Sequence, residues 1–231
     1  MTLLNISPFA ISRWGAFFNH FDLFFKGFLY TLGISFGALL LALILGILSG
    51  GLSTSKSKVG KLISRIYVEV FQNTPLLVQM VFVYYGLAII SNGYVMISAF
   101  FTAVLCVGLY HGAYISEVIR SGIEAVPKGQ TEAALAQGFT ANQTMQLIIL
   151  PQAVRTILPP MTNQVVNLIK NTSTVAIISG ADIMFVAKAW AYDTTNYIPA
   201  FAGAAIFYFV ICFPLASWAR KQEELNKKTY S

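Results

Sequence analysis

Three long runs without a charged side chain constrain this 231-residue chain more than any other feature. They lie between Lys26 and Lys56, between Glu69 and Glu117, and between Asp193 and Arg220. A helix that crosses the hydrocarbon core of a bilayer needs about 20 apolar residues, so the first and last runs can each hold one crossing and the middle run two. A fifth apolar stretch is interrupted only by Lys170. Because a bilayer offers the backbone no hydrogen-bond partners, the sequence predicts an all-α, polytopic membrane protein with five transmembrane helices.

The whole chain, residues 1–231, is expected to form one transmembrane domain. Aromatic side chains at helical spacing predict an interfacial helix over residues 8–22, and these are Phe9, Trp14, Phe17, Phe18, Phe21 and Phe25. The predicted spans cover residues 27–52, 62–90, 95–120, 157–179 and 199–219. Residues 121–156 form a predicted cytoplasmic loop, and residues 180–198 form a predicted outer loop. The first span contains Gly33, Gly37, Gly46 and Gly50 in two pairs of four-residue spacing, which favours close packing within the same bundle over a dimer contact.

The positive charge of the chain indicates its orientation. The formal net charge is +6, yet the cations gather in three separate segments and not in one surface that would suit nucleic acid. These segments follow the first span, flank residues 121–156 and form the tail; their cations are Lys56, Lys58, Lys61, Arg65, Arg120, Lys128, Arg155, Arg220, Lys221, Lys227 and Lys228. Cytoplasmic loops carry the excess of Lys and Arg. We therefore expect the loop and the C-terminus in the cytoplasm and the N-terminus outside.

The fourth predicted span carries one polar face. Its members recur at helical offsets and are Asn163, Asn167, Lys170, Asn171 and Thr174, with Gln164, Thr172 and Ser173 beside them. Amides and an ammonium facing lipid would be costly, so this face is expected to point into the bundle or into a wet cavity. The side chains either hold helices together or line the path of a polar solute, with Lys170 attracting a carboxylate. For the strip as a whole, the lining of a path is the favoured hypothesis.

Prolines mark two expected irregularities. Pro151, Pro159 and Pro160 precede the polar face and are expected to interrupt the helix, either as a hinge or as helix ends. Residues 71–79, which include Pro75, place polar groups within apolar sequence. They are interpreted either as a kinked pore segment or as a capped helix start.

Ionisable groups give no sign of an enzyme. Glu117 and Arg120 are three residues apart and are expected to form a structural pair; a role of Glu117 as ligand for a cationic substrate is the alternative. His20 and His111 are isolated, without the spacing of a metal site. Gly60 and Lys61 lack the surrounding residues of a phosphate-binding loop, so any ATP hydrolysis must occur on another chain.

The segment that begins at Thr131 combines a short helix with a stop. Residues 131–137 contain three alanines and favour a helix; Thr131 is expected to cap it, and Glu132 suits its positive N-terminal end. Gly138 is expected to end the helix in the manner of a glycine cap. Such a rigid knob with small side chains suits a socket on another protein, although an ordinary amphipathic loop helix has the same local features.

The frame Glu132-Ala133-Ala134, then Gly138 and, after nine intervening residues, Ile148-x-Leu150-Pro151 resembles the EAA loop of bacterial ABC importer permeases. Four further motifs resemble the branch for polar amino acids of the histidine, glutamine and glutamate type: Tyr114-x-x-Glu117-x-x-Arg120-Ser121-Gly122-Ile123, Val126-x-Lys128-Gly129-Gln130, Pro151-Gln152-Ala153-x-Arg155 and Lys170-Asn171-Thr172-Ser173. The likeness extends from about residue 27 to 219. The chain departs from the branch at Gln72, where Arg is usual, and at Asn171, where Asp is frequent.

The resemblance implies a type I ABC importer permease in the lipid of the bacterial cytoplasmic (inner) membrane, with no enzyme activity and no cofactor on this chain. In that family a five-span subunit pairs with a second copy or a paralogue, two ATPase subunits that bind ATP and Mg dock on the EAA loops, and an extracytoplasmic binding protein delivers the amino acid. The coupling role falls on Glu132, Ala133, Ala134 and Gly138. The candidate substrate path comprises Glu117, Asn163, Gln164, Asn167, Lys170, Asn171, Thr172 and Ser173.

The expected substrate is an acidic or amide amino acid (glutamate, glutamine or aspartate). A basic amino acid is the alternative, and it is disfavoured because Asn171 lacks the carboxylate that is frequent at this position in the branch. The rival class of function is a secondary amino acid transporter or channel that works without an ATPase. The sequence contains no inverted repeat and no intramembrane relay of acidic residues, which disfavours that class.

Overall fold

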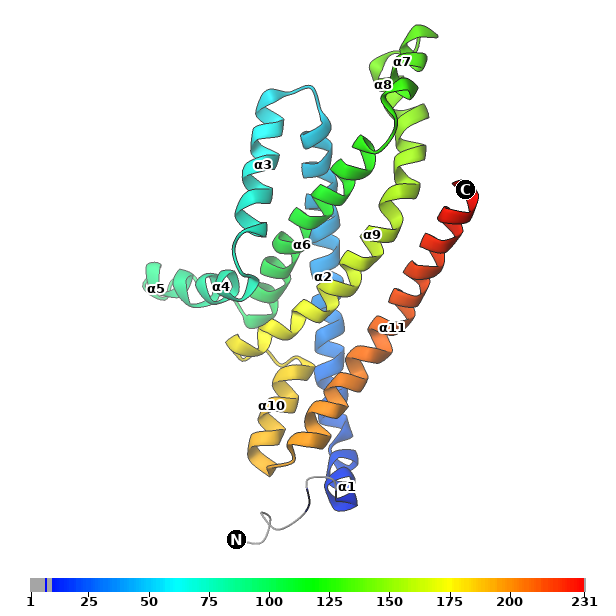
Figure 1. The fold of residues 1–231 in the computed structure, drawn as a ribbon. Helices are drawn as coiled ribbons and strands as arrows, with labels where there is room; N and C mark the ends of the chain where they lie inside the picture. Colours follow the sequence, from blue (N-terminus) through cyan, green and yellow to red (C-terminus); the bar gives the residue numbers. More distant parts are fainter. Residues whose placement is uncertain (1–6, 8–9, 231) are drawn as a thin grey trace. The chain divides into compact units, whose positions relative to one another are not determined.

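The computed structural model of the protein describes residue 7 and residues 10–230, without the side chains of residues 223 and 225–230. Every regular element in this described part is helical (Figure 1). The elements are α1 (Ile11–Asn19), α2 (Phe21–Thr54), α3 (Lys58–Gln72), α4 (Leu76–Val81), η1 (Phe82–Gly86), α5 (Leu87–Ile90), α6 (Ala99–Glu124), α7 (Lys128–Ala136), α8 (Ala141–Gln143), η2 (Thr144–Ile149), α9 (Leu150–Asn171), η3 (Thr172–Ile178), α10 (Ile183–Thr194) and α11 (Tyr197–Tyr230). The prediction of an all-α protein is confirmed.

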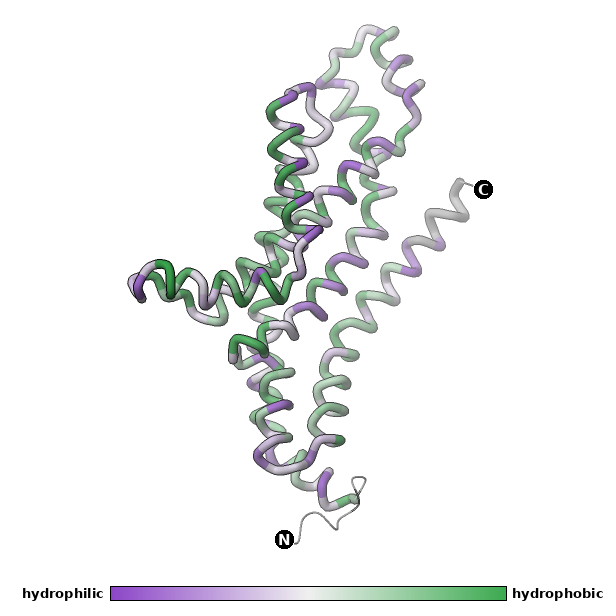
Figure 2. The backbone as a smooth tube through the Cα atoms, turned by 60° about the vertical axis from the view of Figure 1, so that its left-hand side comes forward, coloured by the Kyte–Doolittle hydropathy of each residue, from purple (hydrophilic) through white to green (hydrophobic). Residues whose placement is uncertain are grey.

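Among the described residues, three helices are long and apolar enough to cross a membrane on their own: Phe21–Thr54, Ala99–Glu124 and Tyr197–Gln222. Figure 2 shows that α11 is hydrophobic over its first part and hydrophilic toward the C-terminus. Two pairs of helices pass the same test only when each pair is taken together: Lys58–Gln72 with Leu76–Ile90, and Ala141–Ile178 with Ile183–Thr194. The five predicted spans are reached if each pair is one span.

The predicted span over residues 62–90 is broken into two helices near Pro75, within the segment 71–79 where a kink or a capped helix start is expected. The helix α3 ends at Gln72, and α4 begins only at Leu76. The side chains of the intervening residues take over the hydrogen bonds of the helix end: Asn73 Nδ2 donates to the Glu69 carbonyl at 2.8 Å, and Thr74 Oγ1 donates to the Val70 carbonyl at 2.7 Å. Together with Pro75, which has no backbone N–H to donate, these side chains account for the interruption of the helix.

The expected interruption of the helix at Pro159 and Pro160 is wrong, since α9 continues through both residues. A proline within a helix leaves the carbonyl four residues earlier without its usual donor. Those carbonyls belong to Arg155 and Thr156, which are exposed, so donors from outside the helix can reach them. Pro151 likewise lies near the start of α9, within a run of helical residues that begins with α8 (Ala141–Gln143) and continues through π-helical η2.

The chain divides into two compact units, each assembled from segments that are distant in sequence. Unit 1 comprises Met1–Ala38, Leu76–Val107 and Leu168–Pro214, and unit 2 comprises Leu39–Pro75, Gly108–Asn167 and Leu215–Ser231.

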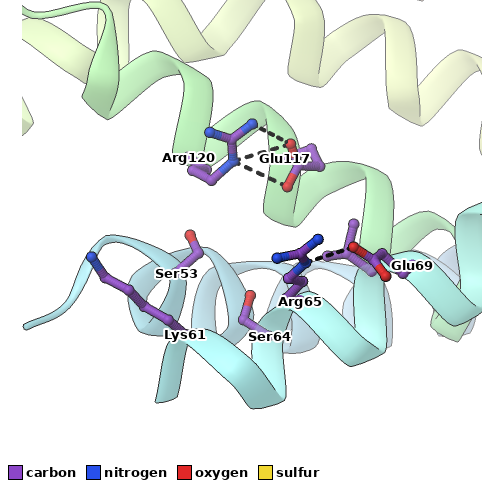
Figure 3. Close-up of a pocket in the computed structure, with 8 residues that line it drawn as sticks. Ser53, Lys61, Ser64, Arg65, Glu69, Glu117 and Arg120 are labelled. Carbon is purple, nitrogen blue, oxygen red and sulfur yellow. Dashed lines mark hydrogen bonds and ion pairs between the residues drawn. The ribbon is translucent and has the colours of Figure 1, made fainter. Parts of the chain in front are cut away.

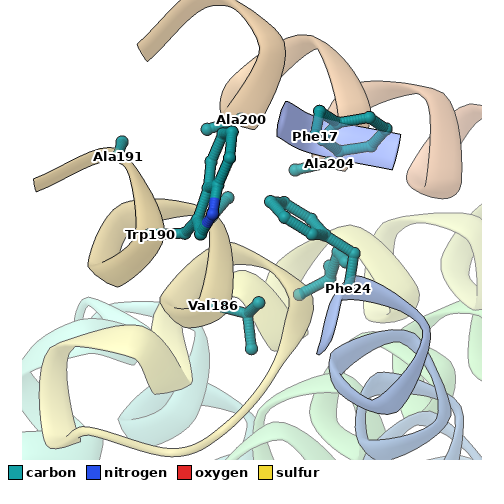
Figure 4. Close-up of a cluster of buried hydrophobic side chains, with 9 residues drawn as sticks. Phe17, Phe24, Val186, Trp190, Ala191, Ala200 and Ala204 are labelled. Carbon is teal, nitrogen blue, oxygen red and sulfur yellow. The ribbon is translucent and has the colours of Figure 1, made fainter. Parts of the chain in front are cut away.

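Unit 1 has an aromatic core in which α1 participates (Figure 4). The ring of Phe17 from α1 lies 4.7 Å from that of Phe24 of α2, and the ring of Phe24 lies 5.5 Å from that of Trp190 of α10. Phe18, the next residue of α1, is 65% exposed, so the helix has one buried and one exposed aromatic side chain at adjacent positions. The predicted range 8–22 was too long: α1 covers residues 11–19, Phe21 and Phe25 belong to α2, and Phe9 lies outside the described residues.

The start of α10 depends on the fully buried Asp182. Its carboxylate accepts hydrogen bonds from the backbone N–H groups of Phe185 at 2.9 Å and Met184 at 3.2 Å, and from the Tyr208 hydroxyl at 3.2 Å.

We expect Asp182→Ala to lower the free energy of unfolding by about 1–2 kcal/mol, because it removes the cap of the helix. Thermal unfolding in detergent measures the loss. Asp182→Asn keeps an acceptor at the cap and should stay closer to wild type; equal losses in both variants would show that the capping contact is not the cause.

The glycines of α2 pack within this chain, as the sequence predicts. In unit 1, a Cβ on Gly37 would lie 3.1 Å from Val104, and in unit 2 a Cβ on Gly50 would lie 2.8 Å from Ile119. The closest approach is at Gly46, where a Cβ would collide with the side chain of Ile115 and lie 3.1 Å from the Gly112 carbonyl. In both units α2 therefore packs on α6 through its glycines.

We expect Gly46→Ala to lower the free energy of unfolding by about 1–3 kcal/mol, because the added methyl group overpacks the contact with Ile115. Gly51→Ala is the matched control, since a Cβ at Gly51 meets nothing within 4 Å and alanine favours helix. Chemical or thermal unfolding in detergent compares the two. Similar stability of both variants would contradict the packing role of Gly46.

Candidate coupling helix and substrate path

The predicted docking knob is present as α7, but it begins one turn earlier than its sequence suggests. The helix starts at Lys128 after Pro127, so Thr131 does not cap it and Glu132 lies beyond its first turn. Both expectations about the N-terminal end are wrong, because Lys128-Gly129-Gln130 continues the helix upstream to its N-cap residue Pro127. Glu132 is exposed on the body of the helix instead.

The structure confirms that Gly138 ends the helix α7, as its sequence predicts. The Gly138 backbone takes φ +86°, a left-handed conformation that favours glycine. Two returning hydrogen bonds close the helix: the Gly138 N–H donates to the Leu135 carbonyl at 3.0 Å, and the Phe139 N–H donates to the Ala134 carbonyl at 3.1 Å. Immediately afterwards, Thr140 and Gln143 form a capping box that opens α8. The turn is thus specified by hydrogen bonds on both sides.

One side of α7 rests on its own chain and the other is uncovered. The helix contacts η2, and Ala134 is buried. By contrast, Glu132 and Ala133 are exposed, and Leu135 is 48% exposed. Among the four predicted coupling residues, Glu132, Ala133 and Gly138 are accessible to another protein, whereas Ala134 anchors the helix.

In unit 2, the polar face of α9 is its uncovered face. Asn163 and Asn167, one turn apart, are exposed, while Thr162 and Val166 are buried. The side chain of Gln164 is half-buried and hydrogen-bonds His111 of α6. Of the two expected surroundings, the chain's own bundle does not cover these asparagines, so a wet cavity stays the prediction for them. The apolar side of α9 packs inward, and the two asparagines point away from the chain's own core.

In unit 1, the end of the strip lies at a cavity of about 290 Å³. Its walls are Lys170, Ser173, Met184, Phe201, Ala204, Ala205 and Tyr208. The ammonium of Lys170 is exposed, and it faces a largely apolar wall on which the Tyr208 hydroxyl and Ser173 are the other polar groups. This combination can hold an anionic group beside an apolar or amide side chain.

Three residues of the strip have local roles. After Asn171 the chain winds into the 3-10 helix η3, so Thr174 leaves the predicted α-helical face. The hydroxyl groups of Thr172, Ser173 and Thr174 donate to the carbonyls of Ile169, Lys170 and Asn171 at 2.7, 2.8 and 2.7 Å. Thr172 is fully buried and does not line the cavity. These hydroxyl groups satisfy the tightened end of the helix.

The predicted pair of Glu117 and Arg120 is confirmed (Figure 3). Arg120 Nη2 donates to Glu117 Oε2 at 2.7 Å, and Arg120 Nη1 donates to Glu124 Oε2 at 2.6 Å. Glu117 thus has a fixed cationic partner. It lines a second cavity, of about 320 Å³ in unit 2, with Ser53, Lys61, Ser64, Arg65, Val68, Glu69 and Arg120.

Sequence reasoning missed the walls of both cavities. Tyr208 and Met184 lie in apolar sequence without polar periodicity, so no local signal marks them as partners of Lys170. Lys61 and Arg65 were interpreted only as indicators of orientation. Their spacing of four residues, with Glu69 four residues further on, was the available signal of a shared helix face.

The described helices are largely apolar, the short helix α7 is exposed, and the polar face of α9 is left uncovered by its own chain. These features are typical of a membrane transport subunit that assembles with other proteins. Comparison with known families gives the particular family. Residues 42–224 match the model of the binding-protein-dependent transport system inner membrane component, and the chain belongs to this family. The resemblance drawn from the motifs is confirmed, and the chain is a multi-pass inner membrane permease subunit and not an enzyme. Family membership implies ATPase and binding-protein partners.

Similar proteins cover nearly the whole chain. A probable glutamine ABC transporter permease protein, GlnM of Bacillus subtilis, is 34% identical over 213 residues, which are 92% of this chain and 97% of that protein. A probable amino-acid ABC transporter permease protein, PatM of Vibrio harveyi, is 36% identical over 85% of this chain and 89% of that protein.

Solved structures share the fold. A crystal structure of an amino acid ABC transporter with histidines has a chain with TM-score 0.84 and 31% identity, covering 91% of this chain and 97% of that chain. An inward-facing MetNI methionine ABC transporter has a chain with TM-score 0.61 at 15% identity, covering 86% of this chain and 94% of that chain, and supports the fold alone.

Proposed function

We propose that this chain is the permease of an amino acid importer that works by alternating access and is driven by ATP hydrolysis on two separate ATPase subunits. The observation that carries the proposal is the exposed helix α7, which ends in the left-handed Gly138 turn and rests on η2 through Ala134. A short helix that is fixed at its base and its end can transmit a movement of a docked ATPase to η2, which it contacts, and to α9, which continues η2 without a break. The likeness to amino acid permeases over 92% of the chain supports the same function.

The substrate we propose is an amide or acidic amino acid, with glutamine first. The uncovered face of α9 offers the amides Asn163 and Asn167, and the single ammonium of Lys170 can receive a substrate carboxylate. The names of the relatives support glutamine. A basic amino acid is the second candidate, because the amino acid ABC transporter that shares the fold at TM-score 0.84 was solved with histidines.

The proposal includes a second permease copy or paralogue over the uncovered face of α9. Amides and an ammonium exposed to hydrocarbon are unfavourable, so another chain and water should cover them. It also includes an N-terminus outside and a C-terminus in the cytoplasm, supported by the distribution of lysine and arginine. In that orientation α7 faces the cytoplasmic ATPases, and ATP and Mg are bound by those subunits.

Reconstitution into liposomes tests the proposal. The permease, with its ATPase and binding protein, should take up labelled glutamine only when ATP is enclosed on the α7 side, and unlabelled arginine should compete less well than glutamate. Uptake by the chain without an ATPase, driven by an ion gradient, would instead identify a secondary transporter and overturn the proposal.

A further inference from the structure

The cavity of unit 2 is lined by positively charged donors that the neighbouring carboxylates do not engage. Three cations and two carboxylates line it. Arg120 is fully engaged by Glu117 and Glu124, but Arg65 uses only its Nε, which donates to Glu69 Oε1 at 2.7 Å. Within the described part of the chain, neither the terminal nitrogens of Arg65 nor the ammonium of Lys61 has a hydrogen-bond or ion-pair partner. Figure 3 shows Arg65 and Lys61 on α3, facing the cavity.

These donors lie beside an uncovered apolar face of the same helix. Leu62 and Ile66 of α3 are 57% and 55% exposed, and Val70 one turn further is 51% exposed. On a helix, Lys61 and Arg65 form one stripe, and Leu62 and Ile66 form the next stripe around the axis. The opposite side of α3, with Gly60, Ser64 and Val68, is buried. The cations therefore stand at the edge of a surface that can only face lipid or another apolar surface.

The length of this surface fits one bilayer leaflet. Lys61 and Val70 are nine residues apart, which is about 14 Å along a helix. Half of a hydrocarbon core of about 30 Å is about 15 Å. A lipid with its headgroup at Lys61 can therefore lay an acyl chain along Leu62, Ile66 and Val70 over the depth of its own leaflet.

We propose that this cavity binds the phosphate of an anionic phospholipid, held by Lys61 and Arg65, with an acyl chain on the apolar face of α3. The two terminal nitrogens of Arg65 can grip phosphate oxygens bidentately, and Lys61 adds a point charge. The carboxylates of Glu69, Glu117 and Glu124 are already paired with arginines, so the ammonium of Lys61 and the terminal nitrogens of Arg65 are left to bind an anion. The occupant is a lipid and not a free anion, because the exposed apolar stripe of α3 lies directly beside the two cations.

Native mass spectrometry of the full chain in detergent tests the site. Purified, delipidated protein is titrated with dioleoylphosphatidylglycerol, and the bound lipid is counted against dioleoylphosphatidylcholine. We expect Lys61→Gln to weaken binding of the anionic lipid about fivefold, and the double variant Lys61→Gln, Arg65→Gln to weaken it about 25-fold, since a cation near anionic lipid contributes a factor of about five. Lys188→Gln removes an exposed cation of unit 1 and should bind as wild type does.

The result that supports the proposal is selective loss of phosphatidylglycerol in the α3 variants, with no displacement by excess inorganic phosphate. Three results would overturn it: retention of the lipid by Lys61→Gln, equal retention of both lipids by the wild type, or displacement by inorganic phosphate, which would identify a free-anion site. Lys61 and Arg65 are exposed, so these variants should fold, and unchanged elution on size exclusion verifies this. The measurement requires no transport and is independent of the proposed function.

Discussion

Replacing Lys170 by alanine is expected to lower ATP-driven amino acid uptake by about tenfold to 150-fold. This range corresponds to the ~1.5–3 kcal/mol of a hydrogen bond to a charged group. Lys170 supplies the one ammonium of the 290 Å³ cavity, whose other walls are mostly apolar, so the substrate carboxylate has no second cationic partner there. The initial rate of uptake by proteoliposomes at subsaturating substrate, with the ATPase and binding protein present, measures the effect.

Two further variants make the result specific. Lys188→Ala removes an exposed lysine of α10 in the same unit, away from the cavity, and should leave uptake within about twofold of wild type. Lys170→Arg keeps the cation and should recover part of the rate. Equal uptake by the Lys170→Ala and Lys188→Ala variants would remove Lys170 from the substrate path. Loss of uptake with unchanged ATPase affinity would support it.

Replacing Gly138 by alanine is expected to weaken the affinity of the permease for its ATPase by about five- to thirtyfold. A Cβ at φ +86° meets no neighbouring atom, so the effect arises from the backbone conformation and not from a collision. A left-handed alanine costs about 1–2 kcal/mol, which the turn can avoid only by giving up its returning hydrogen bonds and changing the end of α7. Binding of purified permease in nanodiscs to immobilised ATPase measures the change.

The chain offers a matched control for Gly138. Gly129 lies in the first turn of the same helix, a Cβ there also meets nothing within 4 Å, and its φ is in the ordinary helical range. Gly129→Ala should therefore bind the ATPase like wild type, and its improved helix propensity should stabilise α7 slightly. If both alanine variants bound equally well, the Gly138 turn would not be part of the docking surface.

Much of the helical architecture could be predicted, because the charge-free runs leave few alternatives. The end of α7 at Gly138 and the glycine contacts of α2 follow from local chemistry that the sequence contains in full. The start of α7 was misplaced because Thr131 and Pro127 are both acceptable beginnings, and the choice depends on how the helix rests on η2.

Other features depend on surroundings that periodicity does not reveal. Pro159 and Pro160 would end a helix in most contexts, but here the carbonyls that they leave without donors belong to exposed residues. The polar face of α9 was found by its spacing, yet spacing cannot show whether a face is covered by the same chain or by another. The partners of Lys170 come from α10 and α11, far along the chain, and carry no motif.

The uncovered face of α9 also bears on how the protein is made. A newly inserted copy carries Asn163, Asn167 and Lys170 on the outside of its own fold, where hydrocarbon would penalise each of them. If a second permease chain covers this face, as proposed, such a copy would gain stability on assembly, and an unassembled copy would be more open to degradation by membrane proteases. The same side chains that would serve the solute would then regulate biogenesis, because the abundance of the subunit in the cell would follow that of its assembly partner.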